Sequence, residues 1–206
     1  MTARGLSLIF AMAMAVAAPG LSRAGDLTAD QGRDVLAELN FARTHPADYA
    51  RHLEQPDASS DDAQGGWSQG EQDPQARDEA IAFLMRQPPL PPLREDARLD
   101  AAAADHSDEQ ARTGAVGHES ESGERLGDRL HRHGLWASLA AEDISYGYIS
   151  PEQVVDQLII DSGVRGRGHR QNIFDPTLQA AGVGCGRHSA YGAMCVIDFA
   201  GAIVQR

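Results

Sequence analysis

Apolar positions in the first hundred residues recur at the spacing of an α-helix. Thr28–Gln31 has the pattern of a capping box and predicts a helix over 29–43. Pro46 suits the first turn of a second short helix, and a third is predicted over 78–86. The apolar side chains expected to face the core from these helices are Val35, Leu36, Leu39, Tyr49, Leu53, Ile81, Leu84 and Met85.

Two segments interrupt this helical pattern. Residues 55–77 contain few apolar side chains and many Asp, Gly, Ser and Gln residues. Such a segment buries too little surface to order itself, so we expect a polar, flexible insert there. The sequence PPLPPL at 88–93 excludes a helix and predicts an extended connector.

The helical pattern resumes at Asp96, and Gly114 is positioned to end that helix. A short amphipathic turn follows and stops at Gly134. Ser150–Gln153 is a second capping box, with proline at the first helical position. The inward faces expected of these three elements comprise Leu99, Ala102, Ala103, His106, Gln110, Leu126, Leu130, Val154, Val155, Leu158 and Ile159.

The end of the chain has the pattern of strands. Residues 182–203 form two apolar segments around a Gly/Ser/Tyr turn. Helices followed by strands, without regular βαβ alternation, indicate an α+β fold, and 206 residues suit one domain. A hairpin centred near Ala190 would place Cys185 and Cys195 on facing strands. In an oxidising compartment we expect a disulfide between them rather than two buried thiols or a metal pair.

The first 24 residues resemble a secretory leader. Arg4 precedes an uncharged, largely apolar run over 6–18, and Ser22 and Ala24 supply small residues before the expected cleavage site. That run is too short to span a bilayer, which takes about 20 residues. We therefore expect a signal peptide over 1–24 and a single exported domain over 25–206, either secreted or periplasmic.

The charge balance limits the class of partner. The chain has 18 Lys+Arg against 30 Asp+Glu, a formal charge of −12 and a pI near 5.0. An acidic chain lacks the basic field that non-specific nucleic-acid binding needs, and it is repelled by anionic membrane surfaces. We expect no nucleic-acid partner and no integral membrane segment after cleavage of the leader.

Two of the eight histidines stand out as candidates for chemistry. His118 in AVGHESES and His169 in RGRGHRQNIF both follow glycine, and Glu142 and Asp161 are the acids best placed to join them. Such a set suits Zn²⁺ or another divalent cation, and it equally suits general acid–base catalysis. His106 lies on an apolar helical face, either as a hydrogen-bonded core residue or as support behind a site.

The remaining histidines have simpler explanations. We expect three of them at the surface, and the two near a helix end complement the helix dipole. In chain order the surface group is His45, His52 and His188, and the helix-end group is His131 and His133. Three arginines, Arg165, Arg167 and Arg170, form a local basic cluster. It could meet an anionic ligand, but pairing with acids such as Asp161 and Asp175 is favoured because the chain has an excess of acid.

Several segments together resemble the CAP superfamily, which unites cysteine-rich secretory proteins, antigen 5 and plant pathogenesis-related proteins with many bacterial secreted proteins. The segments, in family order, are LNFARTHPADYA, PLPPLREDARLDAAAADHSDEQARTG, GHES, AAEDISYG, VVDQLIID, GHRQNIF, AGVGCG and CVIDFAG. The resemblance implies a three-layer α-β-α sandwich with a central antiparallel sheet. It also implies a large cleft with a His/Glu tetrad that can hold a divalent metal.

The tetrad transfers onto this chain residue by residue. The histidines match His118 and His169, and the first glutamate matches Glu142, which is followed here by Asp where family members commonly have Asn. The second glutamate position matches Asp161, whose side chain is one methylene shorter. His106 occupies a helical segment that reads His-Ser in bacterial relatives and is a candidate for lining the cleft.

These observations support three hypotheses for function. The leading one is a secreted module that binds a metal and an extracellular ligand, lipid or envelope partner. The second is a metal-dependent hydrolase, with His118, Glu142, Asp161 and His169 as candidate catalytic residues. However, neither a Gly-x-Ser-x-Gly nor a His-Glu-x-x-His motif is present. The third is a structural envelope protein in which the same four side chains satisfy one another as a buried polar network.

Overall fold

The computed structural model describes residues 24–55, 73–148 and 150–204. The predicted leader, apart from Ala24, and residues 56–72 of the predicted insert lie outside this description. The helices are α1 (Ala24–Thr44), α2 (Pro46–Glu54), α3 (Pro74–Leu84), α4 (Ala97–Thr113), α5 (Leu126–Arg132), α6 (Pro151–Ile160) and α7 (Gly168–Ile173). The strands are β1 (Arg94–Glu95), β2 (Trp136–Ala137), β3 (Ala140–Tyr146), β4 (Ala180–His188), β5 (Gly192–Ala200) and β6 (Ile203–Val204).

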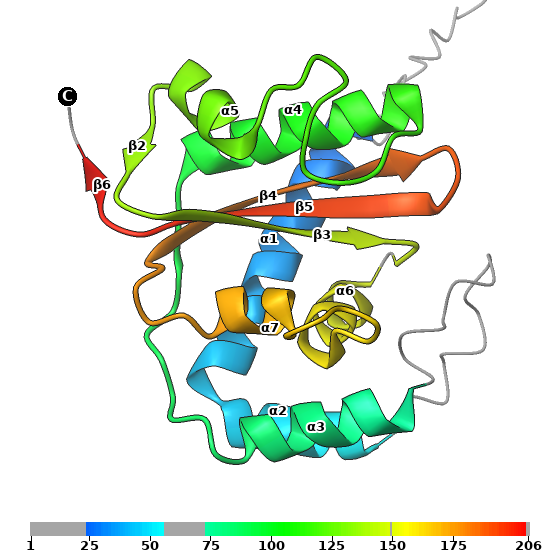
Figure 1. Cartoon of the computed structure of the whole chain (residues 1–206), viewed down its shortest axis with the longest axis vertical. Helices are drawn as coiled ribbons and strands as arrows, with labels where there is room; N and C mark the ends of the chain where they lie inside the picture. The colour runs from blue at the N-terminus through cyan, green and yellow to red at the C-terminus, as the bar shows by residue number, and fades with distance from the viewer. Residues whose placement is uncertain (1–23, 56–72, 149, 205–206) are drawn as a thin grey trace, which may run out of the picture.

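A four-stranded sheet in the order β1-β4-β5-β3 forms the middle layer. The three long strands pair in antiparallel fashion, and only the two-residue β1 runs parallel to its neighbour β4. Helices α4 and α5 cover one face, while α1, α6 and α7 lie against the other, with α2 and α3 beyond them (Figure 1). The expected α+β sandwich of three layers around an antiparallel sheet is therefore confirmed.

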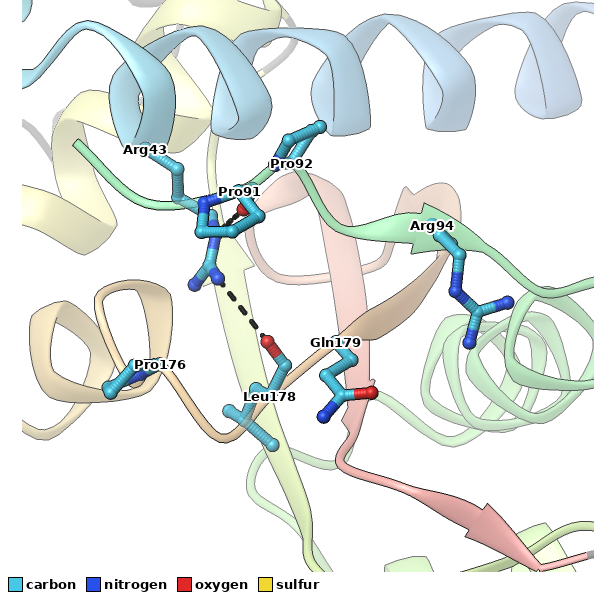
Figure 2. Close-up of a pocket in the computed structure, with 7 residues that line it drawn as sticks. All are labelled: Arg43, Pro91, Pro92, Arg94, Pro176, Leu178 and Gln179. Carbon is cyan, nitrogen blue, oxygen red and sulfur yellow. Dashed lines mark hydrogen bonds between the residues drawn. The ribbon is translucent and has the colours of Figure 1, made fainter.

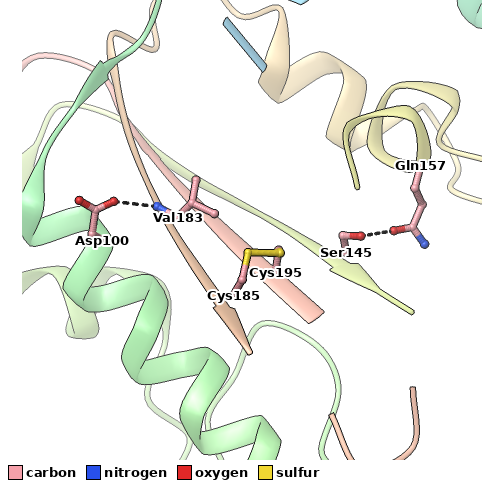
Figure 3. Close-up of a disulfide and its surroundings, with 6 residues drawn as sticks. All are labelled: Asp100, Ser145, Gln157, Val183, Cys185 and Cys195. Atoms are coloured by element: carbon pink, nitrogen blue, oxygen red, sulfur yellow. Dashed lines mark hydrogen bonds between the residues drawn. A yellow bond between two sulfur atoms is a disulfide. The ribbon is translucent and has the colours of Figure 1, made fainter. Parts of the chain in front are cut away.

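Glycines in β4 explain how closely the helix layer approaches the sheet. A Cβ atom on Gly182 would lie 2.1 Å from the Asp100 nitrogen of α4, and one on Gly184 would lie 2.3 Å from the Ala104 nitrogen. Neither position has room for a larger side chain. Asp100 also accepts a hydrogen bond from the Val183 nitrogen at 2.9 Å, which ties α4 to β4 (Figure 3). The Gly-Val-Gly spacing in this strand is therefore a packing feature.

The cysteines lie opposite each other in the hairpin, as predicted. Cys185 of β4 pairs with Cys195 of β5 in the strand register, and a disulfide joins them (Figure 3). Both belong to the main hydrophobic core, which fills the space between the sheet and α1, α2, α3 and α6. Smaller apolar clusters lie on the α4 and α5 side of the sheet. This second face carries most of the polar residues discussed below.

Three expectations from the sequence are wrong. Helix α3 begins at Pro74, not at residue 78, because the Asp73 side chain accepts hydrogen bonds from the Gln75 and Ala76 nitrogens and caps it. Residues 73–77 thus belong to a helix and its cap, not to a polar insert. Met85 ends that helix with its side chain 56% exposed instead of facing the core. His188, expected at the surface, is buried because its Nε2 bonds to the Ala115 carbonyl and its ring packs on Tyr146.

Candidate functional site

His118 and Glu142 form the first of two imidazole–carboxylate pairs. His118 lies in the loop between α4 and α5, and its Nδ1 is 2.9 Å from Oε1 of Glu142 on β3. The histidine side chain is 57% exposed, whereas that of Glu142 is 3% exposed. The other carboxylate oxygen accepts an ion-pair hydrogen bond from buried Arg129 of α5. The same guanidinium donates to the His118 carbonyl at 3.2 Å, so Arg129 holds both members of the pair.

A second acid lies beside this ion pair. Asp198 of β5 is directly opposite Glu142 in the strand register and is completely buried. Burial, together with the negative charge of Glu142, raises the pKa of Asp198 well above its ordinary value. Burial alone would raise the pKa of Glu142 as well, but the bond to His118 and the charge of Arg129 lower it. One carboxyl of this pair is thus held ionised and its neighbour is held neutral.

His106 supports the loop that carries His118. It is completely buried in α4, and its Nε2 lies 2.9 Å from the carbonyl oxygen of Gly117, the residue before His118. Gln110, one helical turn later, bonds to the same carbonyl at 2.6 Å. His106 therefore occupies the core of the α4 face and contacts the loop backbone instead of the His118 ring.

His169 and Asp161 form the second pair. Asp161 ends α6 in the left-handed conformation, with φ 55° and ψ 42°, and is 2% exposed. Its Oδ1 is 2.7 Å from Nδ1 of His169, and its Oδ2 accepts from the His169 backbone nitrogen at 3.0 Å. The short side chain folds back onto the start of α7 from that backbone conformation. Asp is among the residues that tolerate it best.

Electrostatics differ on this side of the sheet. Burial alone would lower the pKa of His169, but its bond to Asp161 and the charges of Asp143 and Asp161 raise it. Asp143 of β3 is completely buried, and burial raises its pKa to about 7, even though His169 and a hydrogen bond from Asn172 act to lower it. The Asn172 amide donates to Asp143 at 2.7 Å and so joins α7 to β3.

The three arginines near His169 do not gather around a cleft. Arg167 pairs with Glu79 of α3 and donates to the Asp161 carbonyl. Arg170 is buried and donates to the Ile159 and Ile160 carbonyls at the end of α6. Pairing is therefore the role of Arg167, although its partner is Glu79 instead of a nearby acid, while Arg170 closes a helix end.

The two pairs approach the same edge strand from opposite sides. Glu142 and Asp143 are consecutive on β3, so their side chains point to opposite faces of the sheet. Arg129 of α5 meets Glu142 on one face, and Asn172 of α7 meets Asp143 on the other. β3 is an edge of the sheet, and both imidazoles lie near it. Within the three described ranges, no three His, Cys, Asp or Glu side chains form a cluster able to hold a metal.

Each imidazole nevertheless has the form of a metal ligand. An Nδ1 that faces an ionised carboxylate carries the ring proton in the neutral form, which leaves Nε2 with a free lone pair. In the described part of the chain, Nε2 of His118 and Nε2 of His169 have no hydrogen-bond partner. The donor types therefore fit a divalent cation with two imidazole ligands and water, or a proton-transfer role for either ring.

Sequence reasoning missed two polar members of this site. The sequence shows Arg129 only as part of a short amphipathic turn, and Asp198 only as part of a strand. A signal for Asp198 does exist: a lone carboxylate in the apolar run VIDFA must find a partner if that strand is buried. Arg129 carries no comparable signal, because its acid partner is supplied by a different element.

Searches of solved structures found proteins with a related arrangement. One is an extracellular protein containing an SCP domain from Bacillus anthracis, with 23% identity and a TM-score of 0.47, covering 63% of this chain and 40% of that one. Another is an outer surface protein from Borrelia burgdorferi, with 17% identity and a TM-score of 0.46, covering 54% and 79%. A third is a cysteine-rich secretory protein from Staphylococcus aureus, with 17% identity and a TM-score of 0.44, covering 64% and 40%.

This chain therefore spans less than half the length of the first and third of these structures. No curated protein matches its sequence. Across the described residues, no helix has the length and apolar character needed to cross a bilayer. The model of the cysteine-rich secretory protein family, CAP, matches residues 36–199, which include all four tetrad positions and both cysteines. The chain belongs to the CAP family.

Proposed function

We propose that this chain is an exported binding protein that holds one divalent cation, such as Zn²⁺, between His118 and His169. The observation that carries the proposal is the matched geometry of the two rings: each Nδ1 is held by a buried carboxylate, at 2.9 Å and 2.7 Å, and each Nε2 is left over. Carboxylates that orient histidine in this way are usual behind metal ligands, where they fix the tautomer and raise the basicity of the ring.

The cation would supply a positive, Lewis-acidic point at the β3 edge of an otherwise acidic protein. Water would complete its coordination, since the described residues offer no third side chain. Glu142 and Asp161 would act behind the imidazoles and not on the ion itself, because their oxygens are already engaged. An extracellular ligand or envelope partner with an anionic or carbonyl oxygen could then replace a bound water.

Zinc titration of the purified domain tests the cation site directly. We expect calorimetry to give one Zn²⁺ per chain at neutral pH. His118→Ala and His169→Ala should each weaken binding by at least tenfold, and Glu142→Gln and Asp161→Asn by about 10- to 100-fold through loss of ring orientation. His45→Ala is the matched control, because His45 is exposed and distant in sequence from both pairs. It should leave the affinity unchanged.

The competing hypothesis of a structural polar network makes the opposite prediction. It is favoured by the buried Arg129–Glu142 ion pair, which satisfies Glu142 without any ion. If chelator leaves the melting temperature unchanged from pH 6 to 8, and both histidine variants bind Zn²⁺ like the parent chain, the metal proposal is wrong. In that case the two pairs serve the fold alone.

Export is tested separately by fractionating cells that express the full chain. We expect the protein outside the cytoplasm, with Gly25 as its first residue. Recovery in the cytoplasm with an intact N-terminus would contradict export, and it would leave the zinc titration unaffected.

A further inference from the structure

A cavity lies at the opposite edge of the sheet from the histidines. Its volume is about 350 Å³, within the range of small-molecule sites. It opens beside β1 and the start of β4, whereas the imidazole pairs flank β3 at the other edge. The residues that line it are Arg43, Pro91, Pro92, Arg94, Pro176, Leu178 and Gln179 (Figure 2).

Arg43 brings a buried cation to this cavity. It is 1% exposed, and its guanidinium extends from α1 between the Pro91 and Leu178 carbonyls (Figure 2). It donates to four carbonyl oxygens, those of Pro91, Ile173, Asp175 and Leu178. These bonds use four of its five N–H groups and leave one at Nη2. All four acceptors are neutral.

No carboxylate neutralises Arg43 within the described residues. The nearest acid charge is that of Asp175, which raises the pKa of Arg43 while burial, the larger influence, lowers it. The Asp175 side chain accepts from the backbone nitrogen and hydroxyl of Thr177 and makes no ion pair with Arg43. A buried guanidinium with only neutral partners is costly, and an anion in the adjoining cavity would offset that cost.

The other lining residues add an apolar wall and a second cation. Three prolines and Leu178 present aliphatic surface, and proline adds no backbone N–H donor. Arg94 and Gln179 are exposed and lie toward the other end of the cavity (Figure 2). Arg94 forms no ion pair in the described part of the chain and is free to meet a ligand that enters from solvent. Positive charge is thus concentrated here on a chain of net charge −12.

We propose that this cavity binds a small organic carboxylate with a compact apolar body. The ring or aliphatic body would contact the prolines and Leu178, and the carboxylate would take up the positive potential of Arg43 and Arg94. Inorganic phosphate lacks the apolar part, and a neutral amide lacks the charge. Both should therefore bind more weakly than a carboxylate of matched size.

Benzoate is the probe for this site, with benzamide as its neutral isostere. In a two-dimensional NMR titration of the full domain, benzoate should shift the amide resonances of Arg94, Leu178 and Gln179 with a Kd of about 1 mM or tighter. Arg94→Gln should weaken binding about two- to fivefold, as expected for a partly solvated charge. Arg86→Gln removes an exposed arginine that does not line the cavity, and it should change nothing.

Three outcomes would overturn the proposal: benzamide or phosphate binding as tightly as benzoate, unchanged affinity in Arg94→Gln, or shifts that map elsewhere. Substitution of Arg43 is avoided because it ties three segments together. Arg94 is exposed, so its variant should fold normally. Zinc titration in the presence of benzoate separates the two sites, since zinc affinity should not change. Failure at this cavity would leave the histidine site standing, and the reverse also holds.

Discussion

The two imidazole–carboxylate pairs have the same local geometry but different supports. Glu142 is fixed by the buried guanidinium of Arg129, with neutral Asp198 beside it. Asp161 is fixed by its own backbone conformation and by backbone nitrogens at the start of α7. One carboxylate therefore depends on a charge partner from another helix, and the other depends on local chain geometry.

This difference shows that equivalent ligand-orienting groups can be held with unequal energetic consequences. Removing a charge partner leaves a buried ion uncompensated, whereas disturbing a local conformation costs only strain. The pair at Glu142 should therefore be the more vulnerable to substitution behind the histidine. The pair at Asp161 should be the more sensitive to pH, because His169 and Asp143 both have raised pKa values.

The largest effect is expected from Arg129→Met. The change leaves Glu142 buried beside Asp198 with only His118 as a partner, and it should reduce the free energy of unfolding by about 3–5 kcal/mol. Urea denaturation followed by circular dichroism gives that value. Arg132→Met, on the same helix but 48% exposed in its ion pairs, is the control and should cost less than about 1 kcal/mol. Equal losses in the two variants would show that Glu142 does not depend on Arg129.

The next largest effect is expected at Asp143. Its folded pKa of about 7 lies above the ordinary value of 3.8, so the folded state holds a proton that the unfolded state has lost between those two values. Stability should therefore fall as pH rises from about 4 to 7. Asp143→Asn, which restores the common family residue, removes this loss and should gain about 1–3 kcal/mol at pH 8.

Denaturation midpoints at pH 5 and pH 8 check this prediction for Asp143. The parent chain should be less stable at pH 8, and the Asn variant should show a smaller difference between the two values. An unchanged difference would mean that Asp143 ionises freely in the fold and that its burial has no titration consequence. Arg129→Met should leave this slope largely intact, which keeps the two sides of β3 distinguishable.

Sequence reasoning found the residues that chemistry needs but not those that hold them. Helix α4 could be predicted from start to end, because the Asp96 cap and the left-handed Gly114 are local signals. The disulfide followed from the hairpin spacing of Cys185 and Cys195. The burial of Arg129 and His188 could not be predicted, since each depends on a partner from a distant segment. The capping role of Asp73 was available locally but was hidden by its polar surroundings.

A smaller effect is expected from Asp161→Glu, which installs the side chain that the family resemblance implies. Glutamate tolerates the left-handed conformation less well than aspartate, and the longer arm overshoots the His169 nitrogen that Asp161 now meets. The variant should lose about 1–2 kcal/mol of unfolding free energy. Asp161→Asn keeps a residue suited to that conformation and isolates the loss of charge. A more stable Glu variant would show that the shorter side chain is not what fits this backbone.

The smallest effects compare the two histidines themselves. His118 is 57% exposed, so His118→Gln should change the free energy of unfolding by no more than about 0.5 kcal/mol at any pH. His169 is 22% exposed, and its hydrogen bond to Asp161 should make His169→Gln cost about 1 kcal/mol. Because the folded pKa of His169 is raised, that stabilisation is complete below the unfolded value of 6.5 and is lost as pH rises through the folded value. Unfolding at pH 5.5 and pH 8.5 should therefore separate the two variants at the lower pH and bring them together at the higher one. A His118 variant that was the more damaging at pH 5.5 would reverse the assignment of which pair responds to protons.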